Sequence, residues 1–137
     1  MFSKRYSSFA AFGFSILIAV LPFTSARAQY QYDFNPACRK AYEEIIRLQL
    51  SSGKTLIEAE KKAHPFNLIP YFLDNYADFF PLFFNEDPAE YAQKRNLRTF
   101  RLNKMAEGSP DSPYYLYTQA AIKFQWALVK VKFAENW

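Results

Sequence analysis

Residues 71–91 read YFLDNYADFFPLFFNEDPAEY, and this stretch decides how the chain folds. Ten of its 21 residues are Phe, Tyr or Leu, and none is Lys or Arg. Placed on a helix, the segment collects bulky apolar side chains on one stripe and polar ones on the other. We therefore predict an amphipathic helix that forms the core of a helical hairpin. The apolar stripe comprises Ile69, Phe72, Leu73, Tyr76, Phe80 and Phe83, and the polar face comprises Asn67, Tyr71, Asp74, Asn75 and Asp78.

Pro81 lies inside this predicted helix. Proline has no N–H to donate to the carbonyl four residues back, so we expect a kink or an early end at this position. The rings on either side of the bend would then form a candidate aromatic pocket for an apolar or carbohydrate ligand. That pocket comprises Phe79, Phe80, Phe83 and Phe84.

Charge is divided into two opposite blocks along the chain. Residues 63–93 hold five acidic side chains and no Lys or Arg, and residues 94–104 hold five basic side chains and no acid. Equal and opposite blocks predict two helices that face each other. Each exposed pair adds only about 0–1 kcal/mol, so the blocks select register more than they stabilise. The alternative is that residues 94–104 form a basic surface for anionic lipid or another polyanion.

Caps and prolines divide the chain into five expected helices. Asn35-Pro36 and Asp87-Pro88 each place a capping side chain before a proline suited to a first helical turn, and Ser112 caps the last helix. Gly53 is the expected stop of the first helix, and residues 55–58 (TLIE) match a capping box. No alternating run indicates a strand. The predicted fold is all-α, with antiparallel helical hairpins. The expected helices are 36–52, 55–64, a third that starts at 67–70 and carries the quoted stretch, 88–108, and one from 114 toward the C-terminus.

The N-terminus has the three parts of a secretory signal peptide. Lys4 and Arg5 precede an almost wholly apolar run over residues 9–23, and residues 26–28 (ARA) supply the small residues that a signal peptidase reads. We predict a signal peptide over residues 1–28, cleavage before Gln29 and export to the periplasm or outside the cell. The alternative is an uncleaved anchor formed by residues 9–23, which would attach the protein to a membrane.

Removing 28 of the 137 residues leaves a helical domain of 109, residues 29–137. Its 14 basic and 13 acidic side chains give a net charge of +1, which excludes the strongly basic type of nucleic-acid-binding protein. Cys38 is the single cysteine and cannot form an internal disulfide. We expect it to be a small buried side chain rather than a reactive thiol.

No catalytic constellation can be assembled from these residues. Asp74 and Asp78 are four apart, as in some carboxylate pairs, but this spacing is common on solvated helix faces. His64 precedes Pro65 at a predicted helix end, where a role at the helix terminus is expected. No nucleophile triad, zinc spacing or glycine-rich phosphate loop is present. We predict a non-enzymatic protein with no metal and no cofactor.

The C-terminal segment contains part of a repeat signature. Trp126, Val129, Lys130 and Phe133 match the spacing of W-x₂-L-G-x₂-Y, the first-helix pattern of a tetratricopeptide repeat, with Lys130 in place of the glycine. Residues 67–91 and 112–137 resemble the N-terminal region of large secreted bacterial tetratricopeptide-repeat-like proteins. The resemblance implies an exported chain that begins a TPR-like α-solenoid and is truncated at its C-terminus. It implies no catalytic residues.

These observations favour a scaffold for protein–protein contacts. Helical repeats bind partners on exposed helix faces, so the partner would be another protein or downstream repeats of the same one. The candidate interaction surface comprises Phe124, Trp126, Phe133 and Trp137. The alternatives are a ligand-binding module that uses the rings around Pro81 and a signal-anchored protein at a membrane surface.

Overall fold

The computed structural model describes residues 29–134, and these residues form an all-α structure. Only an isolated bridge between Gln31 and Asn67 has β geometry in the described part of the chain. The predicted signal peptide, residues 1–28, lies outside the described residues. The helices are α1 (Pro36–Ile46), α2 (Leu50–Ala63), α3 (Ile69–Asn85), α4 (Pro88–Lys94), α5 (Leu97–Met105) and α6 (Pro113–Lys132).

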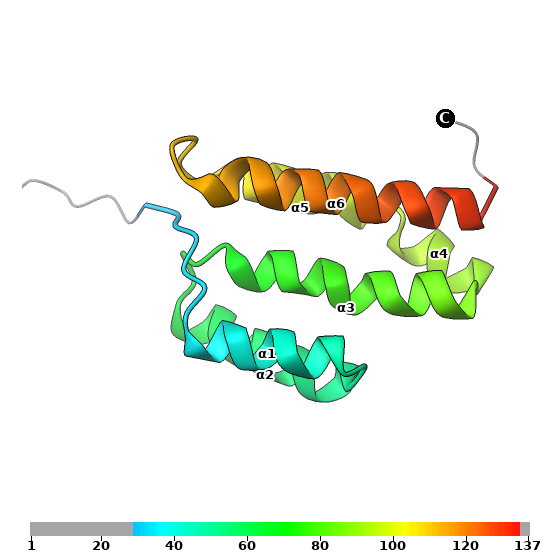
Figure 1. The fold of residues 1–137 in the computed structure, drawn as a ribbon, viewed down its shortest axis with the longest axis horizontal. Coiled ribbons are helices and arrows are strands. Elements are labelled where there is room, and N and C mark those ends of the chain that lie inside the picture. The colour runs from blue at the N-terminus through cyan, green and yellow to red at the C-terminus, as the bar shows by residue number, and fades with distance from the viewer. Residues whose placement is uncertain (1–28, 135–137) are drawn as a thin grey trace, which may run out of the picture.

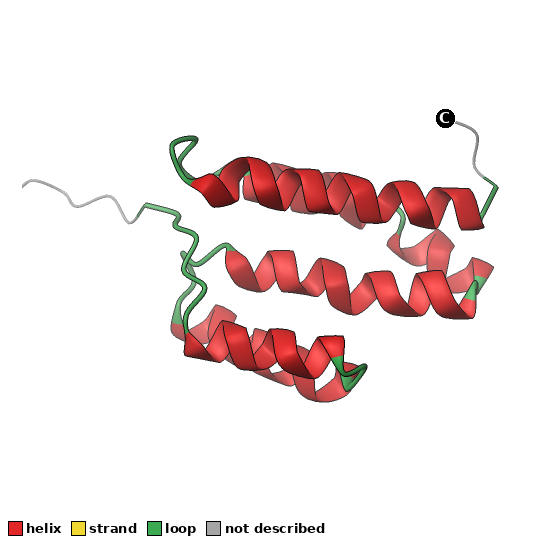
Figure 2. Ribbon diagram, in the orientation of Figure 1, coloured by secondary structure: helices red, strands yellow, loops and turns green. Residues whose placement is uncertain are grey.

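The helices form two layers (Figures 1 and 2). A front layer holds α1, α3 and α6 side by side, and all three run in the same direction. A back layer holds α2 behind α1 and α5 behind α6, and both run the opposite way. The short α4 joins α3 to α5 at one end. Since α3 contacts α1, α2, α5 and α6, it is the centre of the molecule.

The three predicted caps are confirmed. The Asn35 side chain accepts a hydrogen bond from the backbone N–H of Cys38 (3.0 Å), and that of Asp87 accepts one from Ala89 (2.8 Å). Ser112 Oγ accepts one from the N–H of Tyr114 (3.3 Å). In each case a proline follows at the first helical position. These starts are encoded locally, because a cap and its target lie within three residues of each other.

The predicted end of the first helix at Gly53 is wrong. The helix ends at Ile46, and Leu48 makes the turn with a positive φ of 61°. Gly53 lies within α2, where a Cβ atom would come 2.6 Å from Cγ1 of Ile45 and 3.3 Å from the carbonyl oxygen of Ala41. The glycine therefore permits close packing of α1 on α2. The capping box at residues 55–58 is also absent, since the Thr55 hydroxyl donates to the carbonyl of Ser51 inside the helix (3.0 Å).

Two other helix boundaries differ from expectation. Of the two outcomes predicted at Pro81, a kink or an early end, the early end is wrong, since α3 continues for four more residues to Asn85. The single helix predicted over 88–108 is split into α4 and α5 by Arg95 and Asn96. The split allows α4 to stack Tyr91 on Phe133, the C-cap of α6, with ring centroids 4.3 Å apart, while α5 follows a separate path behind α6. Tertiary packing thus overrides a continuous local helical pattern.

The segment before α1 ties the loops at one end of the molecule together. Gln31 donates to the carbonyl of Phe66 (3.0 Å) and accepts from the N–H of Leu68 (2.8 Å). The Tyr32 hydroxyl donates to the carbonyl of Met105, and burial, with Tyr115 nearby, raises the pKa of Tyr32 to about 12. Residues that directly follow the predicted cleavage site are therefore part of the fold, which the sequence patterns did not indicate.

The predicted apolar stripe of α3 is buried at its start, but part of the predicted polar face is buried as well. Ile69, Phe72 and Leu73 are buried as expected. Asn75 and Asp78, however, retain only 1% and 5% of their accessible surface. The central helix is buried on its polar side as well, because the back layer and α6 cover it.

We predict that Gly53→Ala destabilises the protein by about 1–3 kcal/mol, because the new methyl group overpacks Ile45. Alanine would favour the helix by only about 1 kcal/mol over glycine. Urea denaturation measures the difference. Ser52→Ala, an exposed position in the same helix, is the control and should have little effect. A net gain in stability for Gly53→Ala would contradict the close-packing interpretation.

Candidate functional site: an aromatic groove

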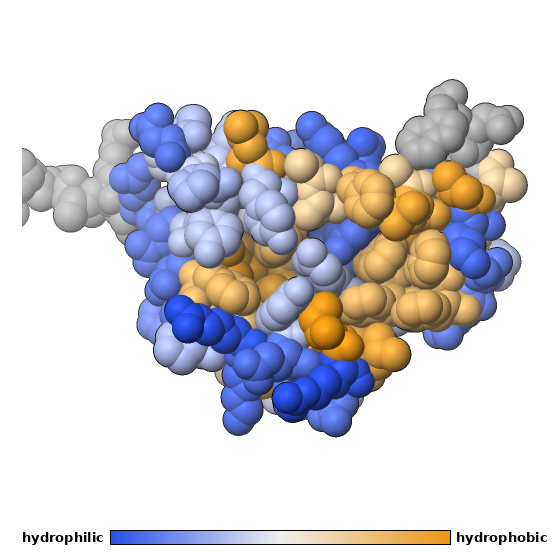
Figure 3. Space-filling view, viewed as in Figure 1, coloured by the Kyte–Doolittle hydropathy of each residue, from blue (hydrophilic) through white to orange (hydrophobic). Residues whose placement is uncertain are grey.

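The front face of the molecule contains an apolar groove. Its floor is α3 and its walls come from α1, the segment before it and the start of α6, enclosing about 600 Å³. The space-filling view shows apolar side chains recessed at this position between more polar walls (Figure 3). We call this the aromatic groove. It is lined by Phe34, Tyr42, Ile69, Phe72, Leu73, Tyr76, Pro113, Tyr114 and Tyr117.

The rings of the aromatic groove contact one another in a continuous series. Tyr76 is central: its ring centroid lies 5.8 Å from that of Tyr42 on α1 and 5.2 Å from that of Phe72, both edge-on. Phe72 in turn meets Tyr117 of α6 at 5.8 Å. Edge-to-face pairs of this kind add about 0.5–1.5 kcal/mol each beyond burial. The walls are thus held by ring contacts and are largely formed without a ligand.

The chemistry of the groove suits binding. None of its nine lining residues is charged, and none carries an amide side chain. Burial, with Tyr117 beside it, raises the pKa of Tyr76, so its hydroxyl stays protonated at neutral pH. The lining can therefore pack against apolar groups and form a few hydroxyl hydrogen bonds. It offers no base or nucleophile.

The rings around Pro81 do not form one pocket. Phe80 and Phe84 line a second cavity of about 330 Å³, together with Pro81, Asn85, Leu48 of the α1–α2 turn and Leu50 at the start of α2. Phe79 and Phe83 stack on each other, with centroids 5.4 Å apart, and do not line that cavity. The larger groove lies towards the start of the helix. Sequence reasoning missed it because its walls come from segments far apart in the chain.

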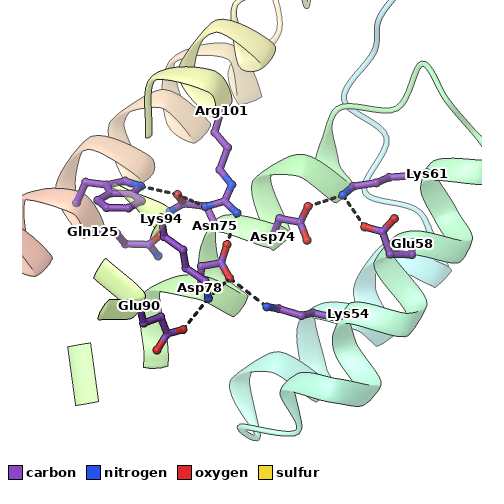
Figure 4. Close-up of polar contacts among 11 residues, drawn as sticks. Lys54, Glu58, Lys61, Asp74, Asn75, Asp78, Glu90, Lys94, Arg101 and Gln125 are labelled. Atoms are coloured by element: carbon purple, nitrogen blue, oxygen red, sulfur yellow. Dashed lines mark hydrogen bonds and ion pairs between the residues drawn. The ribbon is translucent and has the colours of Figure 1, made fainter. Parts of the chain in front are cut away.

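A buried polar network behind the groove fixes the position of α3 (Figure 4). Asp78 pairs with Arg101 of α5, with Lys94 of α4 (2.8 Å) and with Lys54 of α2 (3.0 Å). Asp78 and Arg101 each retain only 5% of their accessible surface. Removing one member of such a buried pair costs about 3–5 kcal/mol, because the other charge is left without compensation.

Asn75 extends this network to α6. Its Oδ1 accepts from the Trp126 indole N–H (2.8 Å) and from Arg101 (3.4 Å), and its Nδ2 donates to Oε1 of Gln125. No buried side-chain nitrogen or oxygen lacks a hydrogen-bond partner in the part of the chain that the structure describes. The network therefore fixes the register of α3 against its neighbours without an unsatisfied group.

The carboxylates of Asp74 and Asp78 form ion pairs that join α3 to neighbouring helices. Burial alone would raise the pKa of Asp78, but Arg101 and Lys94 outweigh it and hold that pKa at about 2. For Asp74, burial outweighs the pairing with Lys61 and raises the pKa. The two opposite charge blocks meet only in part: Lys94 and Arg101 reach Asp78, whereas Asp74 pairs with Lys61 of α2 instead.

The predicted interaction residues lie in different environments. Phe124 is 64% exposed, as a contact residue must be. Trp126 is 3% exposed and is held by Asn75, so it does not belong to the surface. Phe133 is half-buried against Tyr91. Trp137 lies outside the described residues.

His64 and Cys38 take structural positions. The backbone N–H of His64 donates to the carbonyl of Glu60 (2.8 Å), and its Nδ1 lies 2.9 Å from a Glu60 carboxylate oxygen, as expected at the end of α2. Cys38 is 1% exposed, and burial, with Glu60 nearby, raises the pKa of its thiol to about 12. The thiol is protonated and inert at neutral pH.

Two further features concern residues 29–134. Within that range, no three His, Cys, Asp or Glu side chains are grouped so that they could hold a metal ion. None of the described helices is long and apolar enough to cross a membrane.

Comparison with known proteins gave no identification. The chain matches no family model, no curated protein and no solved structure.

We predict that stability decreases as the pH falls from about 4 towards 2. The pKa of Asp78 is about 2 in the folded chain and about 3.9 when unfolded, so its contribution is complete above pH 4 and is lost on acidification. The loss is on the order of 2 kcal/mol. Denaturant unfolding at several pH values measures it.

The variant Asp78→Asn tests whether protonation of Asp78 causes this loss of stability. This variant should lose about 3–5 kcal/mol at neutral pH and show a shallower acid dependence between pH 4 and 2. Asp111→Asn, which removes an exposed loop carboxylate, should leave the acid dependence unchanged. Equal acid dependence in Asp78→Asn and the unmodified protein would be inconsistent with this network.

Proposed function

We propose that this protein is an exported, non-enzymatic scaffold that mediates protein–protein contacts. The two-layer order, in which parallel front helices alternate with antiparallel back helices, is the order expected at the start of a TPR-like α-solenoid. The groups with raised or lowered pKa values serve structural pairs and buried positions, which supports a binding role over catalysis.

The observation that carries this proposal is the aromatic groove on the front layer. Repeat arrays bind partners on a face formed by successive parallel helices, and here α1, α3 and α6 form such a face. Tyrosine supplies a large contact area at low entropic cost, and four of the nine lining residues are tyrosines. We infer that the groove binds an extended protein segment with apolar or aromatic anchors.

An apolar small molecule in the same groove is the second candidate. A volume of about 600 Å³ falls in the range of ligand sites, about 300–1,000 Å³. A carbohydrate is less well matched, because the lining offers only tyrosine hydroxyls to a sugar's many hydroxyl groups.

Peptide selection followed by substitution tests the groove. Peptides selected from a random display library against the purified protein should lose binding by about 10-fold or more with Tyr117→Ala, which removes a half-exposed wall residue. Leu116→Ala is the matched control, since Leu116 is more exposed and lies outside the groove. Selected peptides that bind both variants equally would contradict the proposal. If no peptide is enriched and palmitate displaces an apolar dye only when Tyr117 is present, the small-molecule candidate is favoured.

Export has its own test. When the full chain is expressed in a bacterium with a general secretory pathway, the purified product should have the mass of a chain that begins at Gln29. Ala28→Phe should retain the full-length mass, because the peptidase requires a small residue there. An unprocessed, membrane-associated product from the unmodified chain would support the anchor formed by residues 9–23.

A further inference from the structure

The outer face of α6 carries an apolar stripe that the described residues leave uncovered. Leu116, Phe124 and Val131 are 73%, 64% and 62% exposed, and Ala120 and Ala127 lie between them on the same side of the helix. Apolar side chains follow the upper edge of the molecule over α6 in Figure 3. We call these five residues the outer stripe.

The position of the outer stripe follows from how α6 packs. Thr118, Ile122, Gln125, Trp126 and Val129 form the buried face, against α3 and α5. At 100° per residue, the outer stripe is centred on the opposite side of the helix. Four of the five residues are exposed and Ala127 is half-buried. Scattered exposed apolar residues are ordinary, but a row at helical spacing on a face that no described helix covers indicates an interface.

The order of the stack indicates a helical occupant. The central front helix, α3, packs against back-layer helices on both sides, α2 and α5. Among the described helices, α6 packs against one of these, α5. The outer stripe spans 15 residue steps, or about 22 Å along the axis, and small alanines alternate with large residues, so a helix of about four turns can approach closely.

Charge indicates which kind of helix fits. Several cations of α5 and α6 are already paired: Lys132 with Glu86, Lys104 with Glu107 and Arg101 with Asp78. Lys123, beside the outer stripe, is exposed and forms no ion pair with a described residue. Lys123 lies near the middle of the outer stripe, so a second copy packed antiparallel through the same face would bring the two Lys123 side chains together. Complementarity therefore favours a partner with acidic flanks over self-association.

We propose that the outer stripe of α6 binds an amphipathic helix with acidic flanks, supplied by a separate polypeptide. Its apolar face lies along Leu116, Phe124 and Val131, and its carboxylates lie near Lys123. This site is distinct from the aromatic groove, so the two proposals can fail independently.

Two synthetic helical peptides of about 16 residues test this proposal. Both carry the same Leu/Ala face; one has Glu and the other Lys at the flanking positions. Fluorescence anisotropy with the purified protein at low salt should show binding of the Glu peptide and at least 10-fold weaker binding of the Lys peptide. Phe124→Ser should weaken the binding of the Glu peptide to the protein about 10-fold or more. Lys123→Glu should reduce the preference between the two peptides.

The controls separate this site from the other apolar surfaces. Phe84→Ser removes a comparably exposed ring on α3 (62%), and Tyr117→Ala alters the aromatic groove; both should leave the Glu peptide bound. Circular dichroism checks that each variant is folded. The proposal is overturned if both peptides bind equally, if neither binds at roughly 0.1 mM, or if Phe124→Ser has no effect. Self-association that Phe124→Ser abolishes would identify a second copy as the occupant instead.

Discussion

A carboxylate buried in the middle of a helix determines where the neighbouring helices must lie. Asp78 is nearly inaccessible to solvent, and an isolated charge there would be prohibitively costly. Three cations from three helices compensate it: Lys54 of α2, Lys94 of α4 and Arg101 of α5. One turn earlier, Asn75 binds Trp126 of α6. These two residues of α3 therefore link four other helices, and a shift in the register of α5 or α6 would take buried Arg101 or Trp126 away from its partner on α3.

This constraint also explains why the groove is open. Because the polar side of α3 is occupied by the back layer and α6, its aromatic side faces the front, between α1 and the start of α6. Phe72 and Tyr76 then form the floor of a groove whose walls are held by ring contacts. The polar network sets the orientation of α3, and that orientation exposes the rings of α3 in the groove. Weakening the network should therefore disturb the groove, although the two share no lining residue.

The sequence predicted what is encoded locally and missed what depends on distant packing. The all-α class and three helix starts were correct, because a cap acts within one turn. Gly53 was misread because a stop glycine and a close-packing glycine look alike until the facing helix is known. Asp78 was expected to face the basic block, and Lys94 and Arg101 do reach it, but its burial was missed because it depends on how whole helices pack around α3. For the same reason the groove, whose walls combine Phe34, Phe72 and Tyr117, left no local pattern.

The two apolar surfaces differ in what could cover them. The aromatic groove is concave, uncharged and lined by rigid rings, which suits an extended segment that inserts anchors. The outer stripe of α6 is a convex ridge of alternating large and small residues beside Lys123, which suits the face of another helix. The chain has a single cysteine and therefore no internal disulfide, so packing and the buried polar network hold the fold together. Since that network lies on the inner faces of α3 and α6, a partner can cover either surface without breaking the contacts that fix the fold.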